Sequence, residues 1–260
     1  MPTPIVSVLM PAYNAGRWIG EAIASVKAQT FGNWELCIAV DGSSTAYSGK
    51  TEDERWKIVR EEVTGRILSR CRIRWNFYGE RTNYPVGFNL ALRMASGKFI
   101  ARLDADDSMR PEKLELQVAY LREHPEVDIV STGMRIFGNG PDRVRPGRGM
   151  EWRPYLDMVP ESGVCGPSIM SRCWVYNAIG GLDESDPAAP DEDWHMRTLV
   201  AGMRWGHIAE PLYLYRDHPD SESHRLHDEG IESYRRAAAK YRAAIEARFA
   251  RSTEEMEDAQ

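Results

Sequence analysis

Three carboxylates close one short segment of the sequence. Residues 99–107 read Phe-Ile-Ala-Arg-Leu-Asp-Ala-Asp-Asp, so an apolar run ends at Asp104, Asp106 and Asp107. A strand that carries acidic side chains to its carboxyl end can hold a hard divalent cation, Mg²⁺ or Mn²⁺. One or two carboxylates suffice, because the phosphates that such a cation carries and water complete its coordination. The segment therefore predicts chemistry on a nucleoside diphosphate, and above all on a nucleotide-sugar.

Two simpler explanations account for less of this acidic segment. An aspartate often caps a helix, and Pro111 opens a helical pattern here, but one cap explains one carboxylate rather than three. A calcium-binding loop would place Glu115 at its twelfth position counted from Asp104, yet Met109 stands where such a loop needs glycine. We therefore interpret the segment as a site for a cation and its phosphates.

Polar residues follow two further strand-like runs. The apolar run over 5–10 is followed by Pro11-Ala12-Tyr13-Asn14, and the run over 34–40 is followed by Asp41-Gly42-Ser43-Ser44. Ligands of open α/β sheets bind beyond the carboxyl ends of the strands. Since three strand ends carry polar groups, we expect these ends to form one site.

The hydrophobic pattern alternates between strand-like and helix-like segments. It predicts strands at 5–10, 34–40, 72–78, 98–103 and 127–137, and helices at 19–26, 86–95 and 111–123. Farther along it predicts a long loop over 138–163, a strand at 167–171, helices at 174–179 and 192–200, and a strand ending at 213–218, with Asp191 as the cap of the helix at 192–200. The alternation predicts an α/β fold with a mostly parallel central sheet and flanking helices.

The C-terminal segment from about residue 221 is charged, rich in alanine and helical in pattern. Apolar residues recur at spacings of three and four, namely Ile231, Tyr234, Ala238, Tyr241, Ile245 and Phe249. Such a stripe indicates a helix that packs on the rest of the chain, and a homodimer seam is the alternative.

Composition limits the partners. The chain has 260 residues and a formal net charge of −6, which argues against nucleic acid, although an Arg–aromatic stretch over 66–81 leaves that partner open. No apolar window is long enough to span a membrane, and residues 1–4 do not begin like a signal peptide, so the sequence predicts a cytoplasmic protein. Peripheral association with the inner membrane face would use the Arg-rich stretches, including 143–153, or the C-terminal helix.

Several familiar sites are missing from the sequence. The four cysteines form no C-x-x-C pair, so buried reduced thiols are expected rather than a zinc site. No G-x-G-x-x-G fingerprint, G-x-x-x-x-G-K-[ST] loop or G-x-S-x-G elbow is present. These absences disfavour a dehydrogenase, a P-loop NTPase and an α/β-hydrolase.

An ordered set of motifs resembles the family 2 glycosyltransferases, which have the Rossmann-like GT-A fold. The opening strand over 6–14 is similar to theirs, Asp41-Gly42-Ser43 resembles their second motif, and residues 97–107 resemble their D-x-D segment. Gly180-Gly181-Leu182-Asp183-Glu184 resembles their G-G-[FY]-D-E turn, Glu192-Asp193-Trp194 their E-D motif, and Tyr215-Arg216-Asp217-His218 their closing Y-R-x-H. Each match alone is modest, but all of them occur in order.

The resemblance implies a role for each matching residue. Asp193 would be the catalytic base, Asp106 and His218 would hold the metal, and the Asp41 position would pair with uracil, which suggests a UDP-sugar. The acceptor would contact Asp183, Glu192 and Trp194. The nucleotide-sugar would contact Pro11, Ala12, Tyr13, Asn14, Asp41, Asn83, Asp104, Ala105 and Asp106.

The chemistry of an inverting transfer fits these assignments. A carboxylate must deprotonate the acceptor hydroxyl opposite the leaving diphosphate, whose charge the metal stabilises. Glu192 and Asp193 have a simpler explanation as acids in the first turn of a helix, which the helix dipole favours. The resemblance further implies a GT-A domain over 1–220, with a nucleotide-binding half at 1–107 and an acceptor-binding half at 108–220, followed by a helical extension over 221–260.

The sequence therefore predicts a metal-dependent inverting glycosyltransferase that acts on a glycan, lipid-linked or other polymeric acceptor. Two alternatives remain at this stage. A nucleotidyltransferase would also use a metal and a parallel sheet, and a non-catalytic protein could bind the nucleotide-sugar or a glycan without transferring it.

Overall fold

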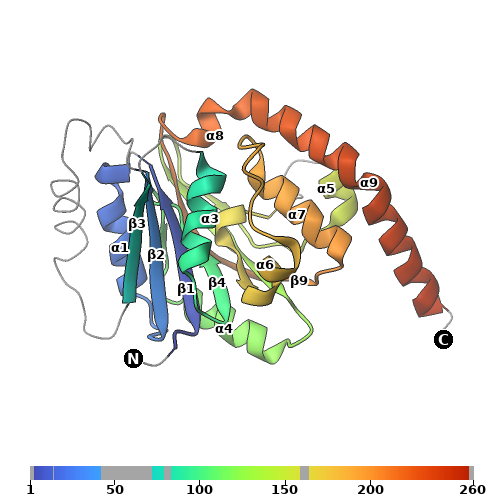
Figure 1. Ribbon diagram of the computed structural model, residues 1–260, viewed down its shortest axis with the longest axis horizontal. Coiled ribbons are helices and arrows are strands. Elements are labelled where there is room, and N and C mark those ends of the chain that lie inside the picture. Colours follow the sequence, from blue (N-terminus) through green and yellow to red (C-terminus); the bar gives the residue numbers. More distant parts are fainter. Residues whose placement is uncertain (1–2, 14, 42–71, 79–82, 159–163, 258–260) are drawn as a thin grey trace.

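The computed structural model is an α/β structure built on one curled sheet (Figure 1). It describes residues 3–13, 15–41, 72–78, 83–158 and 164–257. Within these residues nine strands form the sheet, and helices lie on both of its faces. Asn14, Cys71 and most of the Arg–aromatic stretch over 66–81 lie outside the described residues.

Parallel strands make up the N-terminal part of the sheet. β3 (Arg72–Tyr78), β2 (Trp34–Asp41), β1 (Val6–Ala12) and β4 (Phe99–Arg102) lie side by side in that order and run parallel. Their carboxyl ends lie at the top of Figure 1, on the same side as α8 (Glu222–Arg225). The three strand ends that the sequence analysis selected therefore lie at one edge of the sheet.

The rest of the sheet mixes directions. β8 (Met170–Arg172) pairs antiparallel with β4 and with β6 (Ile129–Gly138), while β6 runs parallel to β9 (Trp205–Asp217). β5 (Ser108–Met109) pairs antiparallel with β9, and β7 (Arg143–Arg145) pairs antiparallel with β6. Parallel pairing covers more residues than antiparallel pairing, so the predicted mostly parallel sheet is confirmed.

The buried strands explain how two helical layers form. Along β1, Val8 and Met10 pack with α1 (Ile19–Lys27) and α4 (Lys113–Glu123), and Leu9 faces the opposite layer. That second layer contains α3 (Tyr84–Met94), α6 (Cys173–Ile179) and α7 (Pro190–Ala201). Because successive side chains of a strand point to opposite faces, a strand covered on both faces must be apolar throughout.

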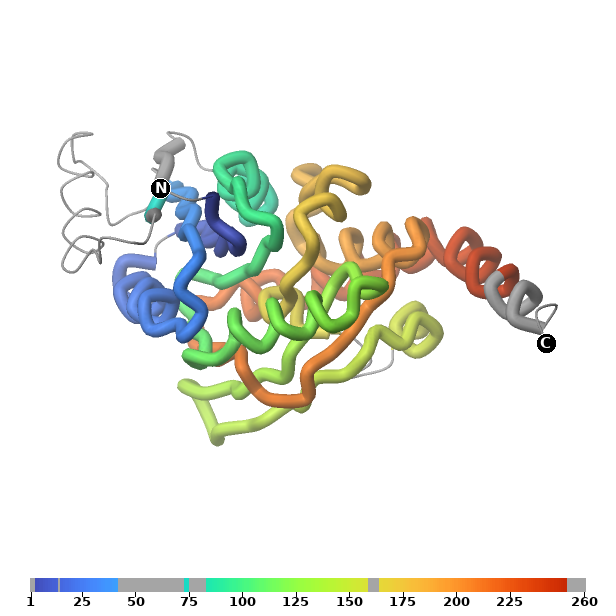
Figure 2. The backbone as a smooth tube through the Cα atoms, turned by 90° about the horizontal axis from the view of Figure 1, so that it is seen from below, coloured from blue at the N-terminus to red at the C-terminus, as the bar shows by residue number. Residues whose placement is uncertain are grey.

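The C-terminal helix α9 (His227–Glu257) packs on the domain, as the apolar stripe predicted. Ala238 and Ile245 are buried in a cluster that includes Tyr155 and Leu156 of α5 (Trp152–Leu156) and Met196 of α7. Figure 2 shows that the far end of α9 extends away from the sheet. A homodimer through this stripe stays a prediction, but the buried members of the stripe already contact α5 and α7.

Several predicted boundaries were wrong. The predicted loop over 138–163 contains β7 and α5, and its Arg-rich stretch pairs with β6 through β7. The strand predicted at 167–171 is divided between a 3₁₀ turn, η3 (Gly166–Ser168), and β8, while a second such turn, η1 (Ala15–Arg17), precedes α1. Ala189, rather than Asp191, is the N-cap of α7, because Pro190 already occupies the first turn.

Two other expectations concern cysteines and membranes. Cys37, Cys165 and Cys173 are free thiols, and burial raises the pKa of Cys37 and of Cys165 to about 12. Among the described residues no helix combines the length and the apolar character that a membrane crossing requires.

A buried polar cluster fixes the start of β4 against β1. Ser7 Oγ accepts a hydrogen bond from Gly97 N at 2.9 Å and donates one to Glu35 Oε1 at 2.6 Å. Glu35 Oε1 also accepts from Ser96 N at 2.6 Å. A Cβ atom at Gly97 would lie 2.7 Å from Ser7 N, so glycine is needed here for close backbone approach.

We expect Gly97→Ala to lower the free energy of unfolding by about 1–3 kcal/mol, the usual cost of overpacking a well-packed interior. Gly32→Ala is the matched control, because a Cβ at Gly32 meets nothing within 4 Å. Urea unfolding of both variants measures the difference. Equal stability of the two variants would contradict the close packing at Gly97.

Candidate active site

The acidic segment after β4 sends its carboxylates to different partners. Asp107 is buried, Asp104 is half-buried, and Asp106 keeps 34% of its side chain exposed. The segment lies between β4 and β5, and its main partners come from β9, more than 100 residues later in the chain.

Asp107 joins the acidic segment to β9. Its Oδ2 accepts a hydrogen bond from Tyr213 Oη at 2.6 Å, and its Oδ1 accepts one from Arg216 N at 2.6 Å. Burial, followed by the charges of Asp106 and Asp104, raises the pKa of Asp107 well above its ordinary value. Asp107 therefore acts as an internal anchor rather than as a ligand for a substrate.

Asp106 and His218 form the pair predicted to hold a metal. His218 Nε2 lies 3.0 Å from Asp106 Oδ2, and the imidazole is 14% exposed. Arg216 supports the pair, since its Nε donates to the carbonyl of Asp106 at 2.9 Å and its guanidinium stacks 4.2 Å from the centre of the Trp18 ring. The two predicted metal ligands are thus brought together from distant parts of the chain.

The donor set fits a divalent cation that also binds diphosphate. No group of three or more acidic, histidine or cysteine side chains gathers as a metal cage among the described residues. One carboxylate and one imidazole leave several coordination positions for phosphate oxygens and water, as Mg²⁺ and Mn²⁺ require when they bind a nucleotide. The partly exposed Asp106 carboxylate can therefore serve such a cation, but does not form a closed protein site.

Asp104 points to the opposite side of the segment. Its Oδ1 accepts a hydrogen bond from Tyr84 Oη at 3.0 Å, and its backbone N donates to Tyr213 Oη at 3.2 Å. Burial, and then the charge of Asp106, raises the pKa of Asp104 to about 7, although Arg102 and the Tyr84 hydrogen bond oppose that rise.

Arg102 links Asp104 to the helix that carries the predicted base. Its guanidinium is 1% exposed, pairs with Asp191 of α7 and donates to Tyr84 Oη at 3.0 Å. It also lies 4.9 Å from the centre of the Phe88 ring. Nε and Nη1 have no hydrogen-bond partner within the described part of the chain. The sequence does carry a signal for this residue, namely a charged side chain at the end of an apolar run, two positions before Asp104.

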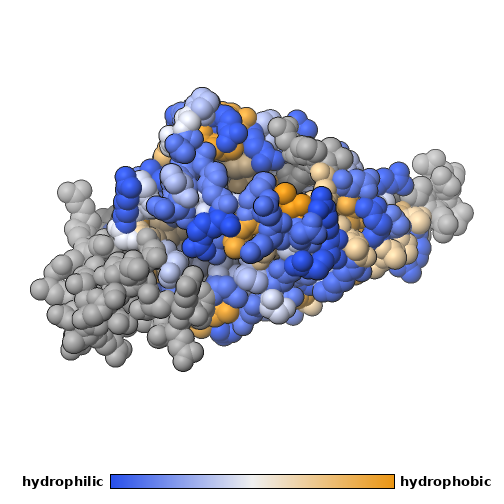
Figure 3. All heavy atoms as spheres, turned by 90° about the horizontal axis from the view of Figure 1, so that it is seen from above, coloured by the Kyte–Doolittle hydropathy of each residue, from blue (hydrophilic) through white to orange (hydrophobic). Residues whose placement is uncertain are grey.

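The other predicted donor-binding residues lie at the ends of β1 and β2. Pro11, Ala12 and Asp41 are buried at these ends, whereas Tyr13 is largely exposed. Seen from above, the coloured part of this side of the molecule is mostly hydrophilic, with several hydrophobic spots (Figure 3). Ala105, within the acidic segment, is buried in the hydrophobic core cluster.

Asn83 has a structural role that the sequence analysis did not foresee. It is the N-cap of α3, because its Oδ1 accepts from Val86 N at 3.1 Å. Its Nδ2 donates to the carbonyl of Glu184 at 3.0 Å, which joins α3 to the Gly180–Glu184 turn. Both ends of the amide are therefore engaged within the protein.

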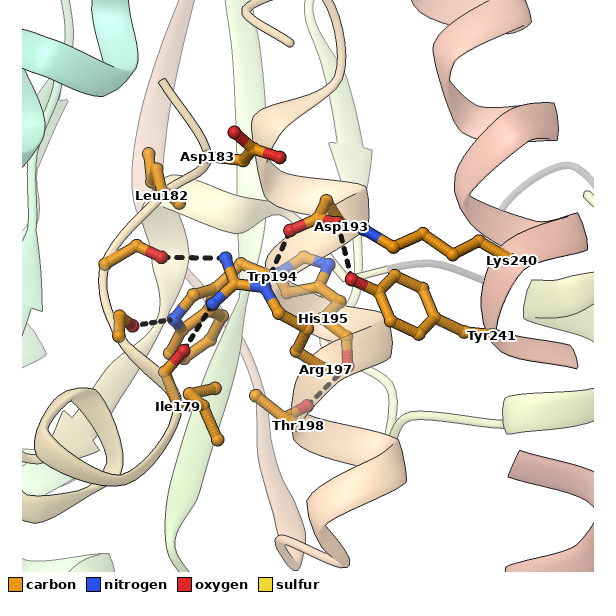
Figure 4. A network of polar contacts seen from close by, with 12 residues as sticks. Ile179, Leu182, Asp183, Asp193, Trp194, His195, Arg197, Thr198, Lys240 and Tyr241 are labelled. Atoms are coloured by element: carbon orange, nitrogen blue, oxygen red, sulfur yellow. Dashed lines mark hydrogen bonds and ion pairs between the residues drawn. The ribbon is translucent and has the colours of Figure 1, made fainter. Parts of the chain in front are cut away.

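Asp193 is held by groups from two helices (Figure 4). Arg197, one turn later on α7, donates from Nε to Asp193 Oδ2 at 2.7 Å. From α9, Tyr241 Oη donates to Asp193 Oδ1 at 3.0 Å, and Lys240 Nζ lies 3.7 Å from the same oxygen. The carboxylate retains 12% exposure, so the predicted base is almost enclosed.

The predicted acceptor residues have unequal surroundings. Asp183 accepts hydrogen bonds from Ser185 N at 2.9 Å and Ser185 Oγ at 2.7 Å, and these bonds lower its pKa. Burial, followed by the charge of Asp191, raises the pKa of Glu192 to about 7. Both remain at least partly accessible.

Trp194, which was expected to contact the acceptor, is buried in the core instead, so that prediction was wrong. Its side chain is fully buried, its Nε1 donates to the carbonyl of Gly180 at 3.2 Å, and its ring stacks 4.9 Å from Tyr176. Trp194 points into the core because the buried face of α7 packs against α6. Its contribution is to fix α7 relative to the Gly180–Gly181 turn.

The profile of the family described as "Glycosyl transferase family 2" matches residues 7–176. EpsE of Bacillus subtilis (strain 168), provisionally named a glycosyltransferase, is 28% identical over 88% of this chain and 79% of its own length. WfgD of Escherichia coli, named as a UDP-Glc:alpha-D-GlcNAc-diphosphoundecaprenol beta-1,3-glucosyltransferase, is 37% identical over 45% of this chain and 41% of its own length.

Solved structures show the same fold. S. aureus TarS 1-349 in complex with UDP-GlcNAc superimposes with a TM-score of 0.65 at 19% identity, covering 84% of this chain and 60% of that one. The mannosyltransferase PcManGT from Pyrobaculum calidifontis, in complex with GDP-Man and Mn2+, gives 0.61 at 17% identity, covering 95% and 76%. The chain thus spans less than two thirds of WfgD and of the TarS fragment. These likenesses confirm the predicted GT-A fold.

We expect Arg102→Met to lower the free energy of unfolding by about 3 kcal/mol, because it leaves the Asp191 carboxylate and Tyr84 without their buried cation. Arg135→Met is the matched control, since Arg135 pairs with Asp142 where both side chains are about half exposed. That pair should contribute less than about 1 kcal/mol. Urea denaturation measures the free energy of unfolding of both variants. Similar losses would show that the buried Arg102–Asp191 pair stabilises the fold no more than the exposed Arg135–Asp142 pair.

Proposed function

Because the chain belongs to glycosyl transferase family 2, we propose that it transfers a sugar from a nucleoside-diphosphate donor to a hydroxyl group of a glycan, lipid-linked or other polymeric acceptor. The observation that carries the proposal is the meeting of Asp106 and His218, 3.0 Å apart, beside Asp104 at the carboxyl end of β4. Oxygen and imidazole ligands at this edge of the sheet suit a cation that holds a diphosphate.

We propose a UDP-sugar as the donor. Asp41 is buried at the end of β2, beside the end of β1 that carries Tyr13, and a carboxylate there can accept the N–H of a uracil ring. WfgD is named for UDP-Glc and TarS was solved with UDP-GlcNAc, which favours a UDP-sugar, whereas PcManGT was solved with GDP-Man. Tyr13, Pro11 and Ala12 would line the nucleoside, with Asn14 beyond the described residues.

Mn²⁺ or Mg²⁺ would be held by Asp106 and His218. Such a cation supplies electrostatic stabilisation of the charge that develops on the leaving diphosphate. The PcManGT complex with Mn2+ supports the choice of metal. Asp104, which Tyr84 and Arg102 orient, would accept hydrogen bonds from the hydroxyl groups of the ribose or sugar.

Asp193 is proposed as the base of an inverting reaction. The acceptor hydroxyl attacks the anomeric carbon on the side opposite the diphosphate, and Asp193 takes its proton. Arg197 and Tyr241 restrain the two carboxylate oxygens, so only a remaining lone pair can accept that proton. Asp183 and Glu192 flank this region and are proposed to contact the acceptor.

The acceptor would lie over the second half of the chain. We propose that residues 1–107 bind the nucleotide, that residues 108–220 bind the acceptor, and that 221–260 is an extension packed on them. The WfgD name contains a lipid diphosphate acceptor, so a lipid-linked acceptor that this chain reaches by peripheral membrane association is part of the proposal.

We expect Mn²⁺ to make the melting temperature rise with one class among UDP-, GDP-, CDP- and dTDP-sugars. A donor at one hundred times its Kd stabilises the native state by about 2.7 kcal/mol. Asp106→Ala should abolish the Mn²⁺-dependent rise, whereas Asp142→Ala, an exposed acid bound to Arg135, should keep it. A rise that persists in EDTA and in Asp106→Ala would refute the metal assignment.

We expect Asp193→Asn to keep the donor-induced rise in melting temperature and to lose transfer by about 10²–10⁴-fold, the usual contribution of a general base. Release of the nucleoside diphosphate in the presence of a glycan and lipid-diphosphate acceptor panel measures transfer, with Asp142→Asn as the control. Wild-type transfer by Asp193→Asn would exclude this base. Release of pyrophosphate from a nucleoside triphosphate would instead indicate a nucleotidyltransferase.

A further inference from the structure

We propose that the C-terminal helix is part of the active site, because Tyr241 of α9 positions the Asp193 carboxylate for proton transfer. The proposal rests on the role of Asp193 proposed above. It assigns to α9 a function in the reaction, which is separate from the packing, homodimer and membrane roles that the sequence pattern suggested.

The contacts of Asp193 divide between its own helix and α9. Arg197 lies four residues later on α7 and holds Oδ2, while Tyr241, 48 residues away in sequence, holds Oδ1. Arg197 also donates to the carbonyls of Ile179 at 2.6 Å and Gly181 at 2.7 Å, so it is fixed to the neighbouring turn. Each carboxylate oxygen therefore has a donor whose own position is set by other elements (Figure 4).

Packing holds Tyr241 in place. α9 buries Ala237, Ala238 and Ile245 against Met196 and Leu199 of α7. Independent polar contacts fix the helix on both sides of Tyr241: Tyr234 Oη donates to the carbonyl of Tyr155 at 2.7 Å, and Arg242 Nη2 donates to the carbonyl of Leu156 at 2.8 Å. The phenol is thus delivered to Asp193 by a rigidly docked helix, which is the arrangement that pre-orients a reacting group.

Tyr241 carries more of this effect than Lys240. The Lys240 side chain is 60% exposed and its Nζ lies 3.7 Å from Asp193 Oδ1, so water screens its attraction. Tyr241 makes a shorter contact at 3.0 Å within a carboxylate site that is only 12% exposed. A hydrogen bond from a neutral donor to a buried carboxylate fixes its direction while leaving other lone pairs available for the acceptor proton.

A control substitution on the same helix can show whether the Tyr241 hydroxyl only docks α9 or also positions Asp193. Tyr234→Phe also deletes one phenol hydrogen bond between α9 and the domain, but its partner is the Tyr155 carbonyl rather than Asp193. If the hydroxyl of Tyr241 only docks α9, the two substitutions should have the same consequences. If it positions the base, only Tyr241→Phe should slow transfer.

The experiment compares full-length Tyr241→Phe and Tyr234→Phe by urea unfolding, by melting temperature with donor and Mn²⁺, and by initial rates of transfer. We expect similar stability and donor affinity for both variants, unchanged kcat for Tyr234→Phe, and a kcat about tenfold lower for Tyr241→Phe. In the Asp193→Asn background, Tyr241→Phe should cause no further loss of the residual rate, because the group it positions is gone.

Two results would overturn the inference while leaving Asp193 as the base. One is an unchanged kcat for Tyr241→Phe when Asp193→Asn has lost transfer. The other is the same tenfold loss in both the wild-type and the Asp193→Asn backgrounds. Wild-type transfer by Asp193→Asn would overturn the base assignment and, with it, this inference.

Discussion

One buried carboxylate, that of Asp107, holds together the two chain segments that carry Asp106 and His218, the proposed metal ligands. Asp106 and His218 are 112 residues apart in sequence, and neither has a reason to meet the other unless the end of β4 is fixed against the end of β9. Asp107 provides that connection through Tyr213 Oη and the backbone N of Arg216. Burying a carboxylate is costly unless hydrogen bonds compensate, so this junction forms only when β9 is in place. The candidate site is therefore a product of the complete sheet rather than of the acidic motif alone.

The parts of the fold that could be predicted from the sequence are those in which burial of an element produces a regular pattern of apolar residues. β1 and β2 are buried on both faces, so they are continuous apolar runs, and the polar residues that end those runs mark the edge of the sheet. The C-terminal helix was predicted for the same reason, because a helix that is buried on one face has apolar residues at spacings of three and four. The stretch over 138–163 was misread because β7 and α5 are only three and five residues long and β7 is mostly exposed, so neither shows a clear hydrophobic period.

The remaining features of the site depend on contacts that no local pattern encodes. Arg102 in an apolar strand looks like an interruption until Asp191 and Tyr84 are placed beside it by α7 and α3. Trp194 follows two acids in a motif associated with acceptor binding, but the packing of α6 decides that its ring is buried. Asn83 is similar, since a residue expected at the nucleoside instead caps α3 and contacts the carbonyl of Glu184. In each case a partner distant in sequence sets the role.

The first turn of α7 shows that the direction in which an acidic side chain points, rather than its residue type, determines its partners. Asp191, Glu192 and Asp193 are consecutive acids, and about 100° of rotation per residue sends them to different surroundings. Asp191 faces Arg102 and so belongs to the proposed donor side, whereas Asp193 faces Tyr241 and Lys240 of α9. Glu192 makes no ion pair among the described residues, and burial leaves its pKa near 7. The donor side and the C-terminal helix are thus joined through one helical turn. A displacement of α9 would reach Asp193 directly, whereas Asp104 is held by Tyr84 of α3 and Tyr213 of β9. For that reason we assign the orientation of the base to α9 and the orientation of the donor carboxylate to α3 and β9.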